Sequence, residues 1–118
     1  MSYFYSVRGW LEVSPDIFSS ITSTISTIRE RWRDNEKAHL YMKGWCWSND
    51  SINWTRYLFY GADVTEEGLT IFRSVINDLI LLKADLSGYF HAQGEDGEKS
   101  IVFRIENDVL LEEARLGV

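Results

Sequence analysis

Residues 38–64 constrain the fold of this chain more than any other stretch. Two runs rich in aromatic and branched residues, 38–47 and 52–64, flank the polar segment 48–51. Such runs favour β-strands, and a polar break of about four residues between them is typical of a hairpin loop. We therefore predict a β-hairpin that contains three of the five tryptophans, namely Trp45, Trp47 and Trp54.

Side chains alternate between the two faces of a strand, so the first run of this hairpin has two distinct faces. The small and aliphatic set, which includes Gly44 and Cys46, is the better candidate for packing beneath helices. We expect Tyr41, Trp45 and Trp47 on the opposite face. The second run is apolar on both faces, and the orientation of residues 54–60 is left open.

Residues 2–13 alternate with a period of two, which predicts a strand. One face holds Tyr3, Tyr5, Val7, Leu11 and Val13, and we expect it to face the core. The other face includes Phe4 and Trp10 among polar residues, which indicates partial exposure.

Two apolar stripes with spacings of three and four predict helices. The first stripe runs from Ile17 to Trp32 and follows Ser14-Pro15-Asp16, a typical helix start. The second stripe covers residues 69–80, with Asp63 as the expected cap and an end near Lys83.

A second hairpin is predicted from residues 86–92 and 100–106, which flank the turn 94–98 with its Asp-Gly step. After it, Asn107 or Asp108 could cap a short final helix over residues 109–116. The resulting order is β-α-β-β-α-β-β with this short helix at the end. We predict a single α+β domain over residues 1–118, a ferredoxin-like (split β-α-β) antiparallel sheet with two helices on one face.

The net charge of −6 is distributed unevenly along the chain. Residues 1–60 have 6 acids and 7 bases, whereas residues 61–118 have 12 acids and 5 bases. A basic partner is favoured and nucleic acid is disfavoured, because phosphate binding requires clustered Lys and Arg. A single cysteine, the lack of a signal-peptide pattern and the lack of a long apolar run predict a cytoplasmic protein that does not enter a membrane.

No motif predicts catalysis, a cofactor or a metal. Cys46 could pair with His39 or His91 as nucleophile and base, but it falls on the expected core face, where a thiolate is disfavoured. The spacing of these three residues is unlike that of zinc sites, and the scattered glycines form no phosphate loop. We therefore expect no catalytic, metal or cofactor residues.

Aromatic residues on the sheet face away from the helices are the strongest functional signal. A second layer or a second copy could cover them, which predicts a homodimer, or a different protein could bind them. RNA-recognition domains also stack bases on such a face, but their Lys/Arg-Gly-Phe pattern is missing here. The rings expected on this face are Phe4, Trp10, Tyr41, Trp45 and Trp47.

In size and character the chain resembles the small acidic immunity proteins of bacterial polymorphic toxin and contact-dependent inhibition systems. The resemblance is to the acidic half from Gly61, the Trp45-Cys46-Trp47 strand and the acidic turn 95–98. It implies a cytoplasmic, non-enzymatic protein that neutralises a toxin, often a basic nuclease, by direct binding.

Two functions are therefore expected from different classes. The first is an inhibitor that binds a basic toxin domain through an acidic and aromatic surface. The second is a ligand-binding or enzymatic domain with a pocket between sheet and helices. The contacts expected for the first are Trp45, Trp47, Asp50 and Trp54 on the first hairpin and Glu95, Asp96 and Glu98 on the second turn.

Overall fold

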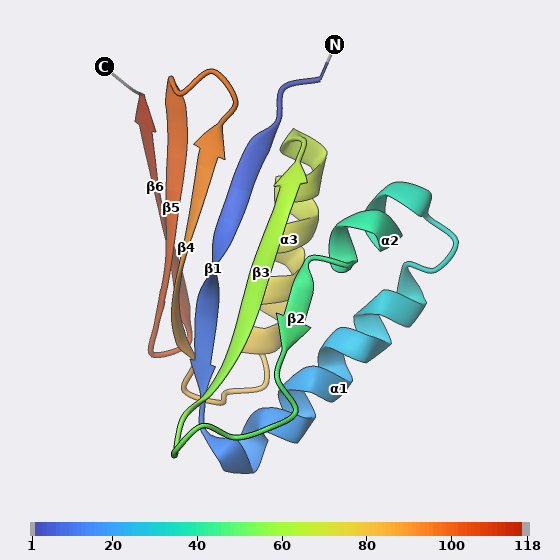
Figure 1. Cartoon of the computed structure of the whole chain (residues 1–118), viewed down its shortest axis with the longest axis vertical. Coiled ribbons are helices and arrows are strands. Elements are labelled where there is room, and N and C mark those ends of the chain that lie inside the picture. The colour runs from blue at the N-terminus through green and yellow to red at the C-terminus, as the bar shows by residue number, and fades with distance from the viewer. Residues whose placement is uncertain (1, 117–118) are drawn as a thin grey trace.

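The computed structural model describes residues 2–116, which form one antiparallel sheet of six strands and three helices. Strand β1 lies near the middle of the sheet, whose order is β2-β3-β1-β4-β5-β6, with β2 and β6 at the two edges (Figure 1). The elements are β1 (Tyr5–Val13), α1 (Pro15–Arg31), α2 (Glu36–Met42), β2 (Trp45–Trp47), β3 (Arg56–Val64), α3 (Glu66–Ile80), β4 (Ser87–Gly94), β5 (Lys99–Glu106) and β6 (Val109–Leu116).

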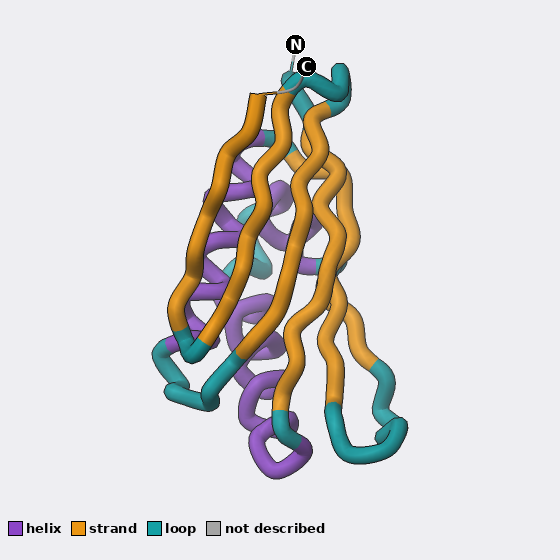
Figure 2. The backbone as a smooth tube through the Cα atoms, turned by 90° about the vertical axis from the view of Figure 1, so that its left-hand side faces the viewer, coloured by secondary structure: helices purple, strands orange, loops and turns teal. Residues whose placement is uncertain are grey.

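The helices cover one face of the sheet and leave the other uncovered. Figure 2 shows the strands as one curved layer with the helices behind it. The burial of β1 follows from this arrangement, because Val7 and Leu11 are buried while Arg8 and Trp10, which alternate with them, are exposed. The strand predicted at residues 2–13 and its two faces are thus confirmed over Tyr5–Val13, while residues 2–4 lie before the strand.

A cluster of aromatic rings fills the core between sheet and helices. The Trp45 ring lies 5.0 Å from Tyr60, 5.8 Å from Phe72 and 5.9 Å from Phe90, measured between centroids. These residues come from β2, β3, α3 and β4, so one cluster joins helix α3 to three strands. Each such aromatic pair adds about 0.5–1.5 kcal/mol beyond the area it buries.

Both predicted long helices are present, although their caps differ in detail from the expectation. Ser14 is the residue before α1, but its hydroxyl donates to the Asp16 carboxylate and does not accept from the helix backbone. At α3, Asp63 is not the cap, because it still belongs to β3. Thr65 takes that role, and its side chain accepts from the backbone N–H of Gly68.

The first strand of the hairpin, predicted to begin at residue 38, was predicted wrongly over residues 38–44. Residues Glu36–Met42 form helix α2, whose N-terminus is capped by the Asn35 side chain accepting from the Ala38 N–H at 3.1 Å. Ala38, Tyr41 and Met42 are buried, a spacing of three and four that fits a short helix. A seven-residue run is too short for its period to distinguish a helix from a strand.

The faces of β2 are the reverse of those expected. Trp45 pairs with Tyr60 in the ladder, and directly opposed residues share a face, so both rings enter the core. Trp47 also faces the helices, while Cys46 between them is exposed on the uncovered face. The expected faces came from an alternation that began at residue 38. Residues up to Met42 belong to helix α2, so only the residues after this helix alternate between the two faces of the sheet.

Residues 109–116 form strand β6 and not the short helix that was predicted. Asn107 and Asp108 have positive φ values of 50° and 61°, and Glu106 pairs directly with Val109 across them. Two consecutive left-handed residues are typical of a two-residue hairpin turn, which Asn and Asp tolerate well. The Asp108 carboxylate also accepts from the N–H groups of Asp85 and Leu86, and so fixes the turn to the start of β4.

Candidate binding face of the sheet

The uncovered side of the sheet, called the open face below, has a row of aromatic rings at its centre. Trp10 on β1 lies opposite Phe59 on β3 and opposite Tyr89 on β4. The Trp10 and Tyr89 ring centroids are 5.6 Å apart, and Tyr57 and Phe59 stack at 6.2 Å. The exposed large apolar side chains of this face are Phe4 39%, Trp10 39%, Tyr57 41%, Phe59 46%, Val109 52% and Leu111 48%.

These rings surround a shallow hollow of about 490 Å³. Its lining is Arg8, Gly9, Trp10, Phe59, Tyr89 and His91. Gly9 allows the sheet to close tightly below the hollow, because a Cβ there would lie 2.6 Å from the Cα of Phe90 on β4. The hollow is therefore built on the two central ladders, β1 with β3 and β1 with β4.

The arginine and histidine side chains of the lining, Arg8 and His91, are neighbours at one side of the hollow. Arg8 and His91 are opposite each other in the ladder between β1 and β4. On its other side Arg8 faces Gly61 of β3, which has no side chain. Within residues 2–116, neither Arg8 nor His91 forms a side-chain hydrogen bond or an ion pair.

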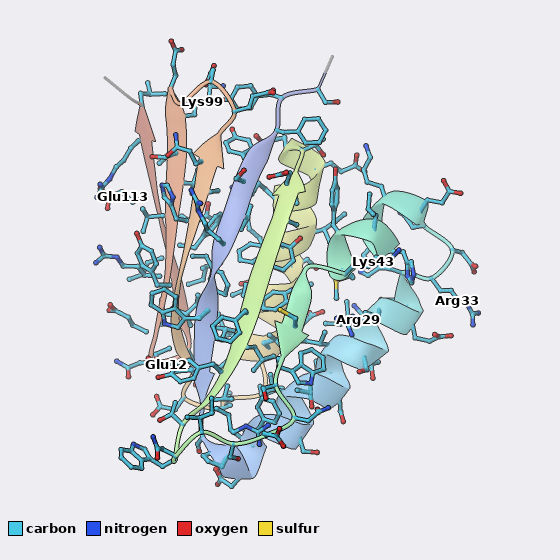
Figure 3. The ribbon with its side chains drawn as sticks, in the orientation of Figure 1. Glu12, Arg29, Arg33, Lys43, Lys99 and Glu113 are labelled. Atoms are coloured by element: carbon cyan, nitrogen blue, oxygen red, sulfur yellow. The ribbon has the colours of Figure 1, made fainter. Side chains whose placement is uncertain are left out.

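Carboxylates on the same face lie around the hollow, and two of them have partners. Glu12 accepts from the Ser87 hydroxyl at 3.2 Å, and Asp63 accepts from the Ser6 hydroxyl at 2.6 Å. Glu12 lies toward the end of β1, as Figure 3 shows. The open face is thus mixed in charge, and two of its arginines, Arg8 at the hollow and Arg104 opposite Tyr89, form no ion pair within residues 2–116.

The tryptophans expected to contact a partner are divided between core and surface. Trp45 is only 2% exposed and is packed among core rings, so its side chain is not part of a surface. Trp47 is half-buried on the helix side, with the Arg29 guanidinium 5.3 Å from its ring centroid. Asp50 and Trp54 lie in the loop between β2 and β3, where Trp54 is 79% exposed.

The second expected set lies at the other end of the sheet. Glu95, Asp96 and Glu98 form the turn after β4, which runs beside the start of β1, since the Glu95 N–H donates to the Phe4 carbonyl. The loop between β2 and β3 instead precedes Arg56, which pairs with Val13 at the end of β1. The structure therefore does not bring the two hairpin turns onto one surface.

Two carboxylates of the acidic turn have partners in the chain. Glu95 accepts from the Phe4 N–H at 3.0 Å, and Asp96 accepts from the Tyr3 hydroxyl and from the Glu98 N–H. The hydrogen bond to Asp96 raises the pKa of Tyr3 to about 12 and lowers the pKa of Asp96. The third carboxylate, Glu98, is exposed and accepts no hydrogen bond from residues 2–116.

The titratable side chains considered for chemistry do not converge. Cys46 is exposed on the open face and not buried, which corrects the expectation, while His39 lies on α2 and His91 on β4. Within residues 2–116, no three His, Cys, Asp or Glu side chains are grouped so that they could hold a metal ion. No helix in this part of the chain is long and apolar enough to span a membrane.

Several residues of the open face were missed from the sequence, chiefly Tyr57, Phe59, Tyr89 and the pair of Arg8 and His91. For β3, the residues toward its C-terminal end could have shown which face is buried. The alternate set that begins at Leu58 stays apolar through Val64, whereas the set that begins at Tyr57 continues into Gly61 and Asp63. Extending the alternation to Val64 would have placed Tyr57 and Phe59 outside the core.

Comparison with known proteins gives no relative for this chain, since no family model, curated protein or solved structure matches it.

Proposed function

We propose that this chain is a non-enzymatic binding protein whose open face docks a protein partner. The observation that supports this most directly is the row of Trp10, Phe59 and Tyr89 on the uncovered side of the sheet. Exposed aromatic rings on a rigid scaffold lose little conformational entropy on binding, and Trp and Tyr are enriched at binding hot spots. Strands held on both sides by ladders provide such a scaffold.

We further propose the function of an immunity protein, which neutralises a toxin by covering its active surface. The acidic, small, single-sheet character of the chain supports this class. The contact set differs from the one expected at first, because Trp10, Phe59 and Tyr89 on the open face take the place of Trp45, Trp47 and Trp54. A basic toxin domain, a cytoplasmic location and the absence of nucleic-acid binding are parts of the same proposal.

The fold proposed to go with this function is an extended split β-α-β layout. The order β2-β3-β1-β4 for the first four strands supports this classification, as do α1 and α3, which link β1 to β2 and β3 to β4. Strands β5 and β6 continue the sheet beyond β4. In such a layout the helices leave one sheet face free for a partner.

A small-ligand site is the second candidate function. The hollow on the open face favours it, because three rings and two polar groups converge there. This site differs from the pocket expected between sheet and helices, where the aromatic core is packed. A homodimer through the open face is the third possible use of the same rings.

The test begins with a pull-down from the native host, followed by binding of the purified partner at two salt concentrations. Replacing Trp10 or Phe59 by Ala should weaken binding by about 2 kcal/mol or more, mainly through faster dissociation, because central rings act as anchors. Trp54→Ala is the matched control, since Trp54 is an exposed aromatic residue outside the open face.

Thermal melts of each variant check that folding is preserved. Wild-type affinity in both Trp10→Ala and Phe59→Ala would contradict the proposal. Binding of the toxin with no loss of the toxin's activity would contradict the immunity role but not the binding face. Sedimentation of the isolated protein as a dimer that depends on the same rings would favour the homodimer instead.

A further inference from the structure

We propose that the hollow between Arg8 and His91 receives a carboxylate which the partner protein presents beside an apolar side chain. This inference rests on the proposed function, namely that the open face docks a protein. It specifies the group of the partner at the centre of that interface, namely a carboxylate. The net negative charge of the chain alone would suggest a basic group there.

The first argument is the missing counter-charge. Arg8 and His91 face each other across the ladder, where opposed Cβ atoms are about 4.5–5.5 Å apart. Within residues 2–116, no carboxylate forms an ion pair with Arg8 or with its open-face neighbour Arg104, whereas four arginines each have one, namely Arg31, Arg33, Arg73 and Arg115. A carboxylate from another protein would accept hydrogen bonds from both side chains and supply the missing negative charge.

The second argument is that aromatic rings surround Arg8 and His91. Trp10, Phe59 and Tyr89 line the same hollow, so a bound partner would exclude water around Arg8. A guanidinium binds a carboxylate through two parallel hydrogen bonds, and such bonds strengthen as the local dielectric constant falls. Room exists beside Arg8, because a Cβ built at Gly61 meets no atom within 4 Å.

The third argument identifies the source of the carboxylate. The hollow is shallow, and a small molecule in it would remain largely in water, unlike ligands in pockets that enclose most of their surface. A nucleic acid would bring several phosphates onto a face that also holds Glu12, Asp63 and Glu106. A protein surface with one acid among apolar groups avoids both difficulties.

The partner surface must then be mixed in charge. Its centre would present an Asp or Glu next to an aliphatic or aromatic residue, opposite Arg8 and the three rings. Its periphery would be basic, opposite carboxylates such as Glu106 and Glu113 on β5 and β6. Such a pattern fixes orientation, because any other alignment would place like charges together.

The experiment is a selection of peptides from a random display library against the immobilised full chain. Clones are kept when their binding is lost in Trp10→Ala and Phe59→Ala, which restricts them to the open face. We expect these clones to contain Asp or Glu adjacent to a large apolar residue. Changing that acid to its amide should weaken binding at least about tenfold, the scale of a charge-assisted hydrogen bond.

A double-mutant cycle then assigns the contact. Arg8→Gln should abolish the difference between the acidic peptide and its amide, and His91→Gln should reduce it. Arg33→Gln is the matched control, because Arg33 is an exposed arginine on the helix side of the molecule (Figure 3) and should leave the difference intact. Indole-3-propionate and poly(U) are measured as free-ligand and nucleic-acid probes.

The outcomes separate the inference from the function on which it rests. If the open-face peptides are basic, or if the affinity difference between acid and amide persists in Arg8→Gln, the inference is wrong. Either result leaves the docking face in place. A library that yields no clone dependent on Trp10 or Phe59 overturns the docking face itself. Indole-3-propionate that binds as tightly as the peptides, or tight binding of poly(U), overturns the assignment to a protein carboxylate.

Discussion

The hydrogen bond from Tyr3 to Asp96 joins the segment before β1 to the turn after β4. It lowers the pKa of Asp96, and it raises that of Tyr3 to about 12. A carboxyl whose pKa is lower in the folded state stabilises the fold above its unfolded pKa, and this contribution is lost as the pH falls through the folded value. A tyrosine with a raised pKa contributes below its unfolded value, and the contribution is lost as the pH rises through about 12.

Tyr3→Phe removes this bond and should lower the free energy of unfolding near neutral pH. The variant should also lose less stability than the wild type on acidification through the Asp96 range, because Asp96 would titrate nearer its ordinary value. Urea unfolding at about pH 7 and about pH 3 measures both effects. Tyr57→Phe is the control, an exposed tyrosine on β3, and an equal acid response in wild type and Tyr3→Phe would contradict the assignment.

Individual residues were predicted well where a strand had one clearly apolar face. The burial of Val7 and Leu11 and the exposure of Trp10 follow from alternation alone. The faces of Trp45 and Cys46 did not follow, because they depend on where helix α2 ends and β2 begins. Arg8 and His91 could not be paired from the sequence, since the ladder that opposes them joins residues far apart in the chain.

Among the elements, β1 and β4 approach each other closely at Gly9. A Cβ at Gly9 would lie 2.6 Å from the Phe90 Cα and 2.7 Å from its Cδ1 atom, and it would also overlap the Tyr89 carbonyl. Gly61 is also in a central strand, but a Cβ there meets no atom within 4 Å. The two glycines therefore differ in packing while sharing a similar place in the sheet.

Gly9→Ala should destabilise the fold by about 1–3 kcal/mol, the usual cost of overpacking, because two ladder strands must move apart. Gly61→Ala should be neutral or stabilising by up to about 1 kcal/mol, because alanine reduces the freedom of the unfolded chain. Chemical denaturation of the two variants beside the wild type provides the comparison. Equal stability of the two variants would show that the strands do not approach this closely.

Helices α1 and α3 and the β4–β5 hairpin were predicted from the sequence, whereas α2 and β6 were not. Helices α1 and α3 and the β4–β5 hairpin each have enough residues for a period to emerge. Helix α2 has seven residues, and β6 was taken for a helix because Asn107 and Asp108 suit a cap as well as a turn. Tertiary contact decided the second case, through the bonds from Asp85 and Leu86 to Asp108.

At the scale of the whole molecule, acids outnumber bases on the β4–β6 side, although Lys99, Arg104 and Arg115 also lie there. The sheet order places β4, β5 and β6 toward one edge, and α1 and α2 lie toward the β2 edge (Figure 1). Figure 3 shows Arg29, Arg33 and Lys43 on the helical side and Glu113 on the far strand. The charge asymmetry along the sequence thus becomes a dipole across the fold, which would orient a charged partner during encounter.

The whole fold should depend on Trp45 and be indifferent to Trp54. Trp45→Ala removes a ring that contacts β3, β4 and α3, and should cost about 3–5 kcal/mol. Trp54→Ala removes a ring that is 79% exposed and should change stability by less than about 0.5 kcal/mol. Thermal unfolding followed by circular dichroism tests the pair, and a stable Trp45→Ala variant would contradict the central position of this ring.

The two outer strands of the sheet are unequal, since β2 has three residues and β6 has eight. Growth of a fibre by strand addition needs two matching edges on every copy, one to receive and one to be received. This chain offers one long edge, whose Glu112, Glu113 and Arg115 also discourage unselective pairing. Copies that met edge to edge would join β6 to β6 and stop as a closed pair, so the unequal edges protect an open sheet from endless self-assembly.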